Sequence, residues 1–199
     1  MGDMYVDPAK TALILMDFQN FTLEYLPSAR DSGLIGRTRD VLDSCRRMGV
    51  LVVFSARSYR EGYPEANPRD AGLMQKKAGQ VQKEGSPSAA IIDELNPRLG
   101  EPIVPKRRTS AFLHNDLDLI LRCASIETLV LAGIATSGAV LSTVRVAADL
   151  NYGLIVLEDC CGDKNEEAHR ALMSHIFPAQ GTVTTSERFV EVLSAGNTS

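Results

Sequence analysis

The sequence predicts an α/β fold, because short apolar runs alternate with amphipathic stretches along its 199 residues. The runs are continuously apolar, which is typical of strands buried on both faces of a parallel sheet. We therefore predict a doubly wound, three-layer α/β/α architecture with a six-stranded, mainly parallel sheet. Five runs are clear and the last is weaker; they occupy residues 12–16, 50–54, 102–104, 128–132, 154–157 and 182–185.

Helical periodicity fills most of the intervals between these runs. Apolar residues recur at helical spacing in 33–48, and the other predicted helices are 88–95, 115–124, 137–150 and 166–176. The stretch 57–87 breaks the rhythm, since it is rich in Arg, Gly, Pro and Lys. It predicts a long loop with room for a short helix, lying over the site as a lid or in an oligomer contact. The length suits one domain, residues 1–199.

Composition excludes several classes of function. A net charge of -4 argues against a general nucleic-acid binder, which needs clustered positive charge. No apolar stretch is long enough to span a membrane, and the N-terminal MGDMYVDPAK has no apolar core of a signal peptide. We therefore expect a cytoplasmic protein with reduced thiols, in which Cys45 and Cys123 lie in the core.

Two charged residues stand where strands are predicted to end, the edge at which open parallel sheets bind ligands. Asp17 follows the first run directly, in LILMDFQN, and a half-desolvated carboxylate there suits proton transfer. The alternative for Asp17 is a helix cap or a salt bridge. Lys106 follows the third run and can hold an anionic substrate or stabilise developing negative charge; the alternative is a solvated surface lysine.

A third segment leads from the fourth run into a predicted helix. The strand is expected to end at Gly133, and Thr136 or Ser137 can cap the helix. Backbone N–H groups at the start of such a helix point back into the cleft, where they can hold an oxyanion or lower the pKa of a thiol.

Together, MDFQN, PKRRTSAF and AGIATSGAVLSTVRVAADLNY followed by LIVLEDCC resemble the isochorismatase-like (cysteine hydrolase) family in order and spacing. The resemblance implies a six-stranded parallel sheet and a triad of Asp, Lys and Cys. These map onto Asp17, Lys106 and position 139. It also implies a cis peptide bond between Ile134 and Ala135, and an oxyanion hole made by the N–H groups of Ala135 and Ala139.

The chain departs from that pattern at one position. Residue 139 is alanine, and a methyl group cannot attack a carbonyl carbon. Ser137 is expected to cap the helix rather than replace the thiol. Cys160 and Cys161 follow the fifth run and could line the cleft, but no base is evident beside either one.

The remaining site residues are predicted from their positions in the chain. No metal or other cofactor is expected, because His114, His169 and His175 lack the spacing of zinc ligands near a strand end. The resemblance implies a small-molecule substrate and a homodimer or homotetramer. Candidate substrate-binding residues are Gln19, Arg57, Phe112, Ser137 and Gly138, with Asn20 and Tyr59 as further candidates.

Three functions remain open from the sequence. In the first, suggested by the isochorismatases of the family, Asp17 is the general acid of a vinyl-ether hydrolysis, Lys106 anchors a carboxylate, and Ala139 is a pocket wall. In the second, the chain is a C–N amidohydrolase for amides, ureides or carbamoyl compounds, seen with its cysteine replaced by Ala139. In the third, a non-catalytic member of the family binds a small molecule without turnover.

Overall fold

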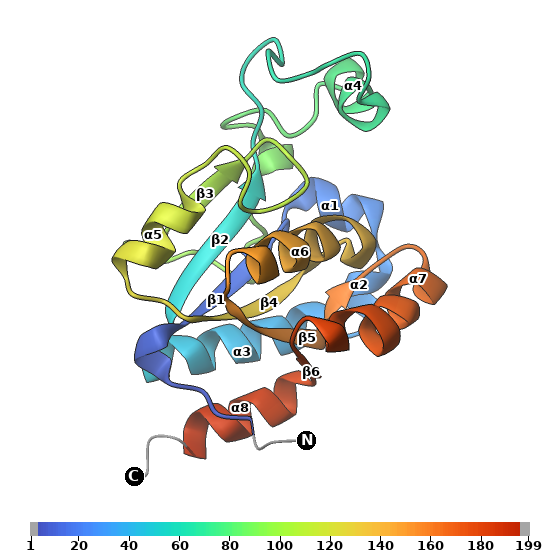
Figure 1. Ribbon diagram of the computed structural model, residues 1–199. Helices are drawn as coiled ribbons and strands as arrows, with labels where there is room; N and C mark the ends of the chain where they lie inside the picture. Colours follow the sequence, from blue (N-terminus) through green and yellow to red (C-terminus); the bar gives the residue numbers. More distant parts are fainter. Residues whose placement is uncertain (1–3, 196–199) are drawn as a thin grey trace.

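A six-stranded, all-parallel sheet forms the centre of the protein, in the order β3-β2-β1-β4-β5-β6 (Figure 1). The structure is a computed structural model and describes residues 4–195. All six predicted runs form strands, so the predicted fold class is confirmed. The strands are β1 Thr11–Met16, β2 Leu51–Arg57, β3 Ile103–Lys106, β4 Thr128–Ile134, β5 Gly153–Gly162 and β6 Thr182–Thr184.

Both faces of the sheet are covered by helices, because its central strands are apolar on both sides. Every residue of β1 is buried. Leu13 and Leu15 face one cluster of apolar side chains, whereas Ile14 and Met16 face the other, as the two-residue repeat of a strand requires. Packing on both sides therefore fixes the sheet as the middle of three layers.

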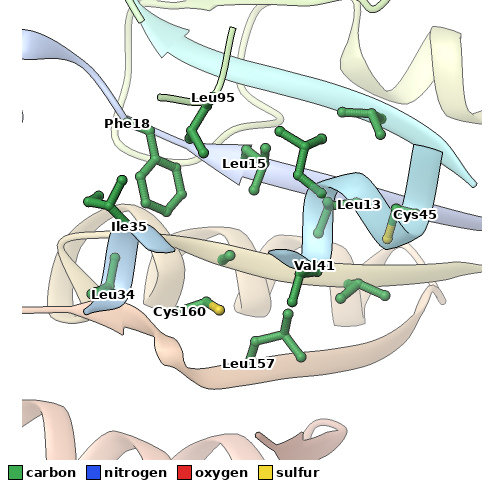
Figure 2. Packing of buried hydrophobic residues seen from close by; sticks show 14 of the residues in the cluster. Leu13, Leu15, Phe18, Leu34, Ile35, Val41, Cys45, Leu95, Leu157 and Cys160 are labelled. Carbon is green, nitrogen blue, oxygen red and sulfur yellow. The ribbon is translucent and has the colours of Figure 1, made fainter. Parts of the chain in front are cut away.

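One face is covered by α1 Asn20–Tyr25, α2 Ser28–Asp31, α3 Leu34–Met48 and α8 Ser186–Ala195. Figure 2 shows part of this layer, where Val41 and Cys45 of α3 lie against Leu13 and Leu157 of the sheet. The other face is covered by α5 Leu117–Cys123, α6 Leu141–Asp149 and α7 Glu166–Ala171, which continues into the turn Leu172–Ile176.

The sequence prediction is wrong for residues 88–95, which form only the short 3-10 helix Pro87–Ala89 and an irregular segment. Ile92 and Leu95 are buried at helical spacing, but the backbone pairs instead with the chain after β1: the Ile92 N–H donates to the Phe18 carbonyl. Pairing with the chain after β1 thus uses a backbone N–H group that a helix would need for its own hydrogen bonds. Helices α1, α2 and α8 were not predicted.

Residues 57–87 leave the sheet and rise over its carboxyl edge (Figure 1). They contain the helix α4 Ala71–Ala78, whose N-terminus is capped by the Asp70 side chain. Their own small core consists of Tyr59, Tyr63 and Leu73. We call these residues the 57–87 segment; they are held by their own packing rather than by the two main cores.

Gly133 fixes the distance between β4 and β1 at the end of both strands. A Cβ atom on this residue would lie 2.7 Å from the Cβ and 2.9 Å from the carbonyl oxygen of Met16, which is closer than real contacts allow. The absence of a side chain at Gly133 therefore lets Ile134, the last residue of β4, lie close to Asp17, which follows β1. Within residues 4–195, no helix has both the length and the apolar character of a membrane span.

We expect Gly133→Ala to destabilise the protein by about 1–3 kcal/mol, because the added methyl group overpacks a contact with backbone atoms. Gly36→Ala is the matched control: it lies inside α3 with open space around the added carbon, and should be neutral or stabilise by about 0.5–1 kcal/mol. Urea unfolding of both variants measures the two effects. Equal stability of Gly133→Ala and the parent chain would contradict the close approach.

Candidate active site

A cavity of about 450 Å³ opens at the carboxyl edge of the sheet, beside β1 and β4. The strand order reverses between these two strands, since β1 leads to β2 and β3 on one side and β4 leads to β5 and β6 on the other. Connections leave such a switch point in opposite directions and create a crevice for ligands. The cavity is lined by Asp17, Phe21, Thr22, Tyr25, Arg57, Gly72, Gln75, Lys76, Gly79, Val81, Gln82, Ile134, Ala135, Gly138 and Ala139.

Asp17 and Lys106 form a buried ion pair at the base of this site. The Asp17 backbone has a φ of 58°, a left-handed conformation that aspartate tolerates better than most residues and that ends the strand. Its Oδ2 lies 2.7 Å from the Lys106 Nζ and 3.5 Å from the Arg57 Nε. Its Oδ1 is buried and has no hydrogen-bond partner among the described residues. One carboxylate oxygen is thus held by cations, and the other is left for a ligand.

Lys106 lies behind Asp17 rather than in the cavity. It is fully buried, it does not line the cavity, and its Nζ also donates to the Thr109 carbonyl at 3.0 Å. Burial lowers the pKa of the Lys106 ammonium to about 8, against the opposing attraction of the Asp17 carboxylate. The structure therefore gives Lys106 contact with Asp17 and no surface on which to anchor a substrate carboxylate.

Arg57 comes from the end of β2, between the strands that carry Asp17 and Lys106. The side chain of Gln19 fixes its backbone on both sides: the Gln19 Nε2 donates to the Arg57 carbonyl, and the Gln19 Oε1 accepts from the Arg57 N–H. The Arg57 Nη1 donates to the Tyr59 hydroxyl at 2.8 Å. Arg57 thus brings a positioned positive charge to the cavity wall.

Lys76 of α4 brings a further positive charge that the sequence analysis missed. Its ammonium lies 2.7 Å from the Gln82 Oε1 and 4.5 Å from the centre of the Phe21 ring. Burial, followed by the nearby Arg57 guanidinium, lowers the pKa of Lys76 to about 8. Sequence offers no signal that separates Lys76 from Lys77, because only the fold of the 57–87 segment turns one of them into the cavity.

The opposite end of the site is a tight turn after β4. The Ile134–Ala135 peptide bond is cis, and residues Thr136–Val140 form a π-helical turn. Asp163 holds this turn, since one of its oxygens accepts from both the backbone N–H and the hydroxyl of Ser137 at 2.7 Å. The Ala135 N–H donates to no acceptor among residues 4–195, which leaves it available to a ligand.

His169 supports the same turn. Its Nδ1 lies 2.8 Å from the Thr136 hydroxyl, which places this histidine near the carboxyl end of β4. Burial lowers its pKa, against the attraction of Asp163. In the described part of the chain, no group of three or more His, Cys, Asp or Glu side chains is arranged to hold a metal ion.

Several predicted binding residues lie outside the cavity. Gln19 is fully buried and its amide is used by backbone groups; Phe112 packs in the core beside Tyr152; the Ser137 side chain turns to Asp163. Position in the chain places such residues after a strand but does not determine where their side chains point. Asn20 and Tyr59 also do not line the cavity, whereas Arg57, Gly138 and Ala139 do.

None of the four cysteines lines this cavity. Cys160 and Cys161 belong to β5 and are buried, and burial raises the pKa of the Cys160 thiol to about 12 and that of Cys161 further. Cys45 is in the core as predicted. The same prediction is wrong for Cys123, the last residue of α5, which is exposed, whereas Leu117 and Leu121 are the buried residues of this helix.

Comparison with protein families matches the isochorismatase domain to residues 11–188. The isochorismatase family protein YwoC of Bacillus subtilis is 30% identical over 191 residues, which cover 96% of this chain and 98% of YwoC. The ureidoacrylate amidohydrolase RutB of Agrobacterium fabrum is 30% identical, with coverage of 94% of this chain and 91% of RutB.

Solved structures share the fold. A cysteine hydrolase from Pseudomonas syringae pv. phaseolicola superposes with a TM-score of 0.87 at 22% identity, covering 98% of this chain and 97% of that one. The N-carbamoylsarcosine amidase of Thermoplasma acidophilum superposes with a TM-score of 0.73 at 27% identity, covering 89% of this chain and 97% of that one.

The lowered pKa of Lys76 predicts that the stability gained by removing its charge depends on pH. The folded chain releases this proton near pH 8, whereas an unfolded chain keeps it to about pH 10.5. The unfolded state binds more protons between these values, so this contribution to stability rises with pH there. We expect Lys76→Met to raise Tm relative to the parent by about 2–4 °C at pH 7, which is the shift that about 1 kcal/mol produces in a domain of this size. The difference in Tm between the two proteins should become smaller as the pH approaches 10.5.

Calorimetry of both proteins from pH 7 to pH 10.5 measures this gap. Lys77→Met is the control, because Lys77 belongs to the same helix but does not line the cavity. Its difference from the parent should not narrow over this range. A gap for Lys76→Met that stays constant with pH would contradict the burial of a charged amine.

Proposed function

Because this chain belongs to the isochorismatase family, we propose that it hydrolyses a small anionic molecule by acid catalysis, without a covalent thiol intermediate. One observation carries the proposal: the cavity holds a carboxylate oxygen, Asp17 Oδ1, that has no hydrogen-bond partner in the described chain, and it has the methyl group of Ala139 where the family pattern has a thiol. Proton transfer is the chemistry that such a carboxyl group offers, and nucleophilic attack by a cysteine is not.

In the proposed reaction, Asp17 donates a proton from Oδ1 to the terminal carbon of a vinyl ether. Oδ2 is held by Lys106 at 2.7 Å, which leaves Oδ1 to carry the proton. Protonation forms a C–H bond and an oxocarbenium ion. Water adds to this ion and returns one proton to Asp17. The hemiacetal or hemiketal then breaks its C–O bond and gives a carbonyl compound and an alcohol, so that one water molecule is consumed.

The charge around Asp17 supports an anionic substrate. Three cationic side chains surround the one carboxylate, which leaves a surplus of positive charge in the empty site. A bound anion offsets that surplus. Lys106 then acts on Asp17, by holding Oδ2 and fixing the orientation of the carboxyl group.

The turn after β4 supplies the second half of the proposed site. Its first N–H groups, those of Ala135 and Ala139, would donate to an oxygen atom of the substrate near the reacting carbon. Asp163 and His169 keep this turn in place from behind, through Ser137 and Thr136. Ala139 serves as an apolar wall of the cavity, and its small size leaves room for substrate.

C–N amide hydrolysis is the second candidate function. It is favoured by the similarity to ureidoacrylate amidohydrolase and N-carbamoylsarcosine amidase, and by the place of Ala139 in the same cavity as Asp17. In this alternative, the sulfur of a cysteine at position 139 would bond to the carbonyl carbon while Asp17 accepts the thiol proton. Asp17 would pass this proton to the leaving nitrogen as the C–N bond breaks, and water would then hydrolyse the thioester and free the thiol. The chain would then carry a complete amidase site that lacks only its nucleophile.

Replacing the proposed acid tests the first candidate. Across a panel of small carboxylated vinyl ethers, we expect Asp17→Asn to lower kcat by about 10²–10⁴-fold, the usual contribution of a general acid. Iodoacetamide should leave the parent activity unchanged, since no thiol lines the cavity. Lys106→Met should also reduce kcat, because it removes the contact at Oδ2 that fixes the orientation of the Asp17 carboxyl group. Glu127→Gln, far along the chain and outside the cavity, is the control.

Two outcomes would contradict this reaction: an Asp17→Asn variant that keeps full activity, or a parent protein that alkylation inactivates. A parent protein inactive on every vinyl ether of the panel would also count against it. Circular dichroism and melting curves of each variant separate loss of the acid from loss of the fold.

Restoring a thiol tests the second candidate. If the remaining site is an amidase site, Ala139→Cys should hydrolyse small ureido or carbamoyl compounds, and iodoacetamide should abolish that activity. Ala139→Val introduces a side chain of similar size to cysteine but no thiol, and this variant should remain inactive on these compounds. An Ala139→Cys protein that folds, is alkylated at position 139 and hydrolyses none of these compounds would exclude the amidase alternative.

A further inference from the structure

Two cations that line the cavity, Lys76 and Arg57, are only partly compensated by the carboxylates of residues 4–195. The Lys76 ammonium contacts only the neutral Gln82 amide and the Phe21 ring, and it forms no ion pair with any described carboxylate. Arg57 lies 3.5 Å from an Asp17 oxygen that Lys106 already holds at 2.7 Å, and its Nη2 has no acceptor in the described chain. Both charges are therefore left only partly compensated.

Their burial makes this arrangement costly without a ligand. An ammonium group on the protein surface keeps its water, whereas Lys76 loses much of it to the walls of the cavity, as its lowered pKa shows. An anion that enters the cavity would form a charge-assisted hydrogen bond with Lys76 and neutralise part of the Arg57 charge. The binding of an anionic group is therefore favoured by these two charges.

The surroundings of Lys76 fix its position. The Gln82 side chain, which accepts from Lys76, donates through its Nε2 to the Gln19 Oε1 at 3.2 Å. The backbone N–H of Gln82 donates to the Ser88 hydroxyl. Gln19 in turn holds the backbone of Arg57. One buried amide network therefore sets the places of both cations.

We propose that Lys76 and Arg57 bind a carboxylate group of the substrate, which makes the substrate a small carboxylic acid with an apolar body. This assignment deepens the function proposed above and rests on it. It moves carboxylate binding away from Lys106, which is buried behind Asp17. The apolar part of the ligand would lie against Phe21, Tyr25 and Ile134, the three largest apolar or aromatic side chains of the cavity wall.

Carboxylate is the chemistry that best fits the two cations. A planar guanidinium and a single ammonium offer several N–H donors to the two oxygens of a carboxylate. The cavity of about 450 Å³ also limits the ligand to a small molecule. Because Lys76 belongs to helix α4 and Arg57 to the end of β2, such a ligand would join α4 to the sheet.

Binding of matched acids and amides tests the assignment independently of turnover. The probes are benzoate with benzamide, phenylacetate with phenylacetamide, and butyrate with butyramide, each titrated at pH 7 with NMR or calorimetric detection. We expect the parent protein to prefer the acid over the amide in at least one pair. Lys76→Gln should weaken binding of that acid by about 10-fold or more, the usual effect of losing a hydrogen bond to a charged group. Binding of the matching amide should change little.

Three further variants make the result specific. Lys77→Gln should bind like the parent, and Lys76→Arg should keep the preference for the acid, because it keeps the charge. Asp17→Asn removes the proposed acid but leaves both cations, so it should retain or strengthen carboxylate binding. Failure of the proposed hydrolysis would therefore leave this binding pattern intact. The assignment is overturned if no acid is preferred over its amide, or if Lys76→Gln weakens acid and amide equally.

Discussion

The site depends on the buried contact between the Asp17 carboxylate and the Lys106 ammonium. Each charge would be costly to bury alone, so each requires the other. The sheet makes the contact possible: β3, β2 and β1 lie side by side and run in the same direction, and their carboxyl ends present Lys106, Arg57 and Asp17 in a row. Because two cations compete for Oδ2, Oδ1 is left without a partner, and the chemistry of the site follows from that asymmetry.

The other half of the site depends on a glycine, whose lack of a side chain permits a close contact between two strands. Gly133 lets β4 approach β1 where a methyl group would collide with Met16. Directly beyond this contact, β4 turns into the segment Ile134 to Ala139, and β1 ends at Asp17. The switch in strand order makes the crevice, and this close approach sets its width. The 57–87 segment then closes the crevice with a helix that neither core holds.

The sequence predicts the strands and the site residues that stand at strand ends, but it does not predict the site residues that the loops position. All six strands, and the convergence of Asp17 with Lys106 and the turn at 134–139, follow from the apolar runs and from the rule that ligands bind at the carboxyl edge. Lys76 could not be found this way, since it lies in a short helix of the 57–87 segment, outside the sheet, and has no register with the strands. Phe112 and Gln19 were placed in the pocket because they are near a strand end, but burial turned the first into the core and the second toward backbone groups. The apolar spacing in 88–95 reflects burial without a helix.

The residue at position 139 affects the net charge of the cavity and therefore the charge of the ligand that the cavity favours. A cysteine at position 139 would bring a thiolate among Arg57, Lys76 and Lys106, whose positive charges would stabilise it. With alanine there, Asp17 is the only anion on the cavity wall, and the positive surplus has no partner within the described chain. A protein that buries uncompensated charge gives up stability, and a ligand of opposite charge restores it on binding. The alanine at position 139 therefore leaves the positive charge of the cavity uncompensated, and a negatively charged ligand is the partner that this charge favours.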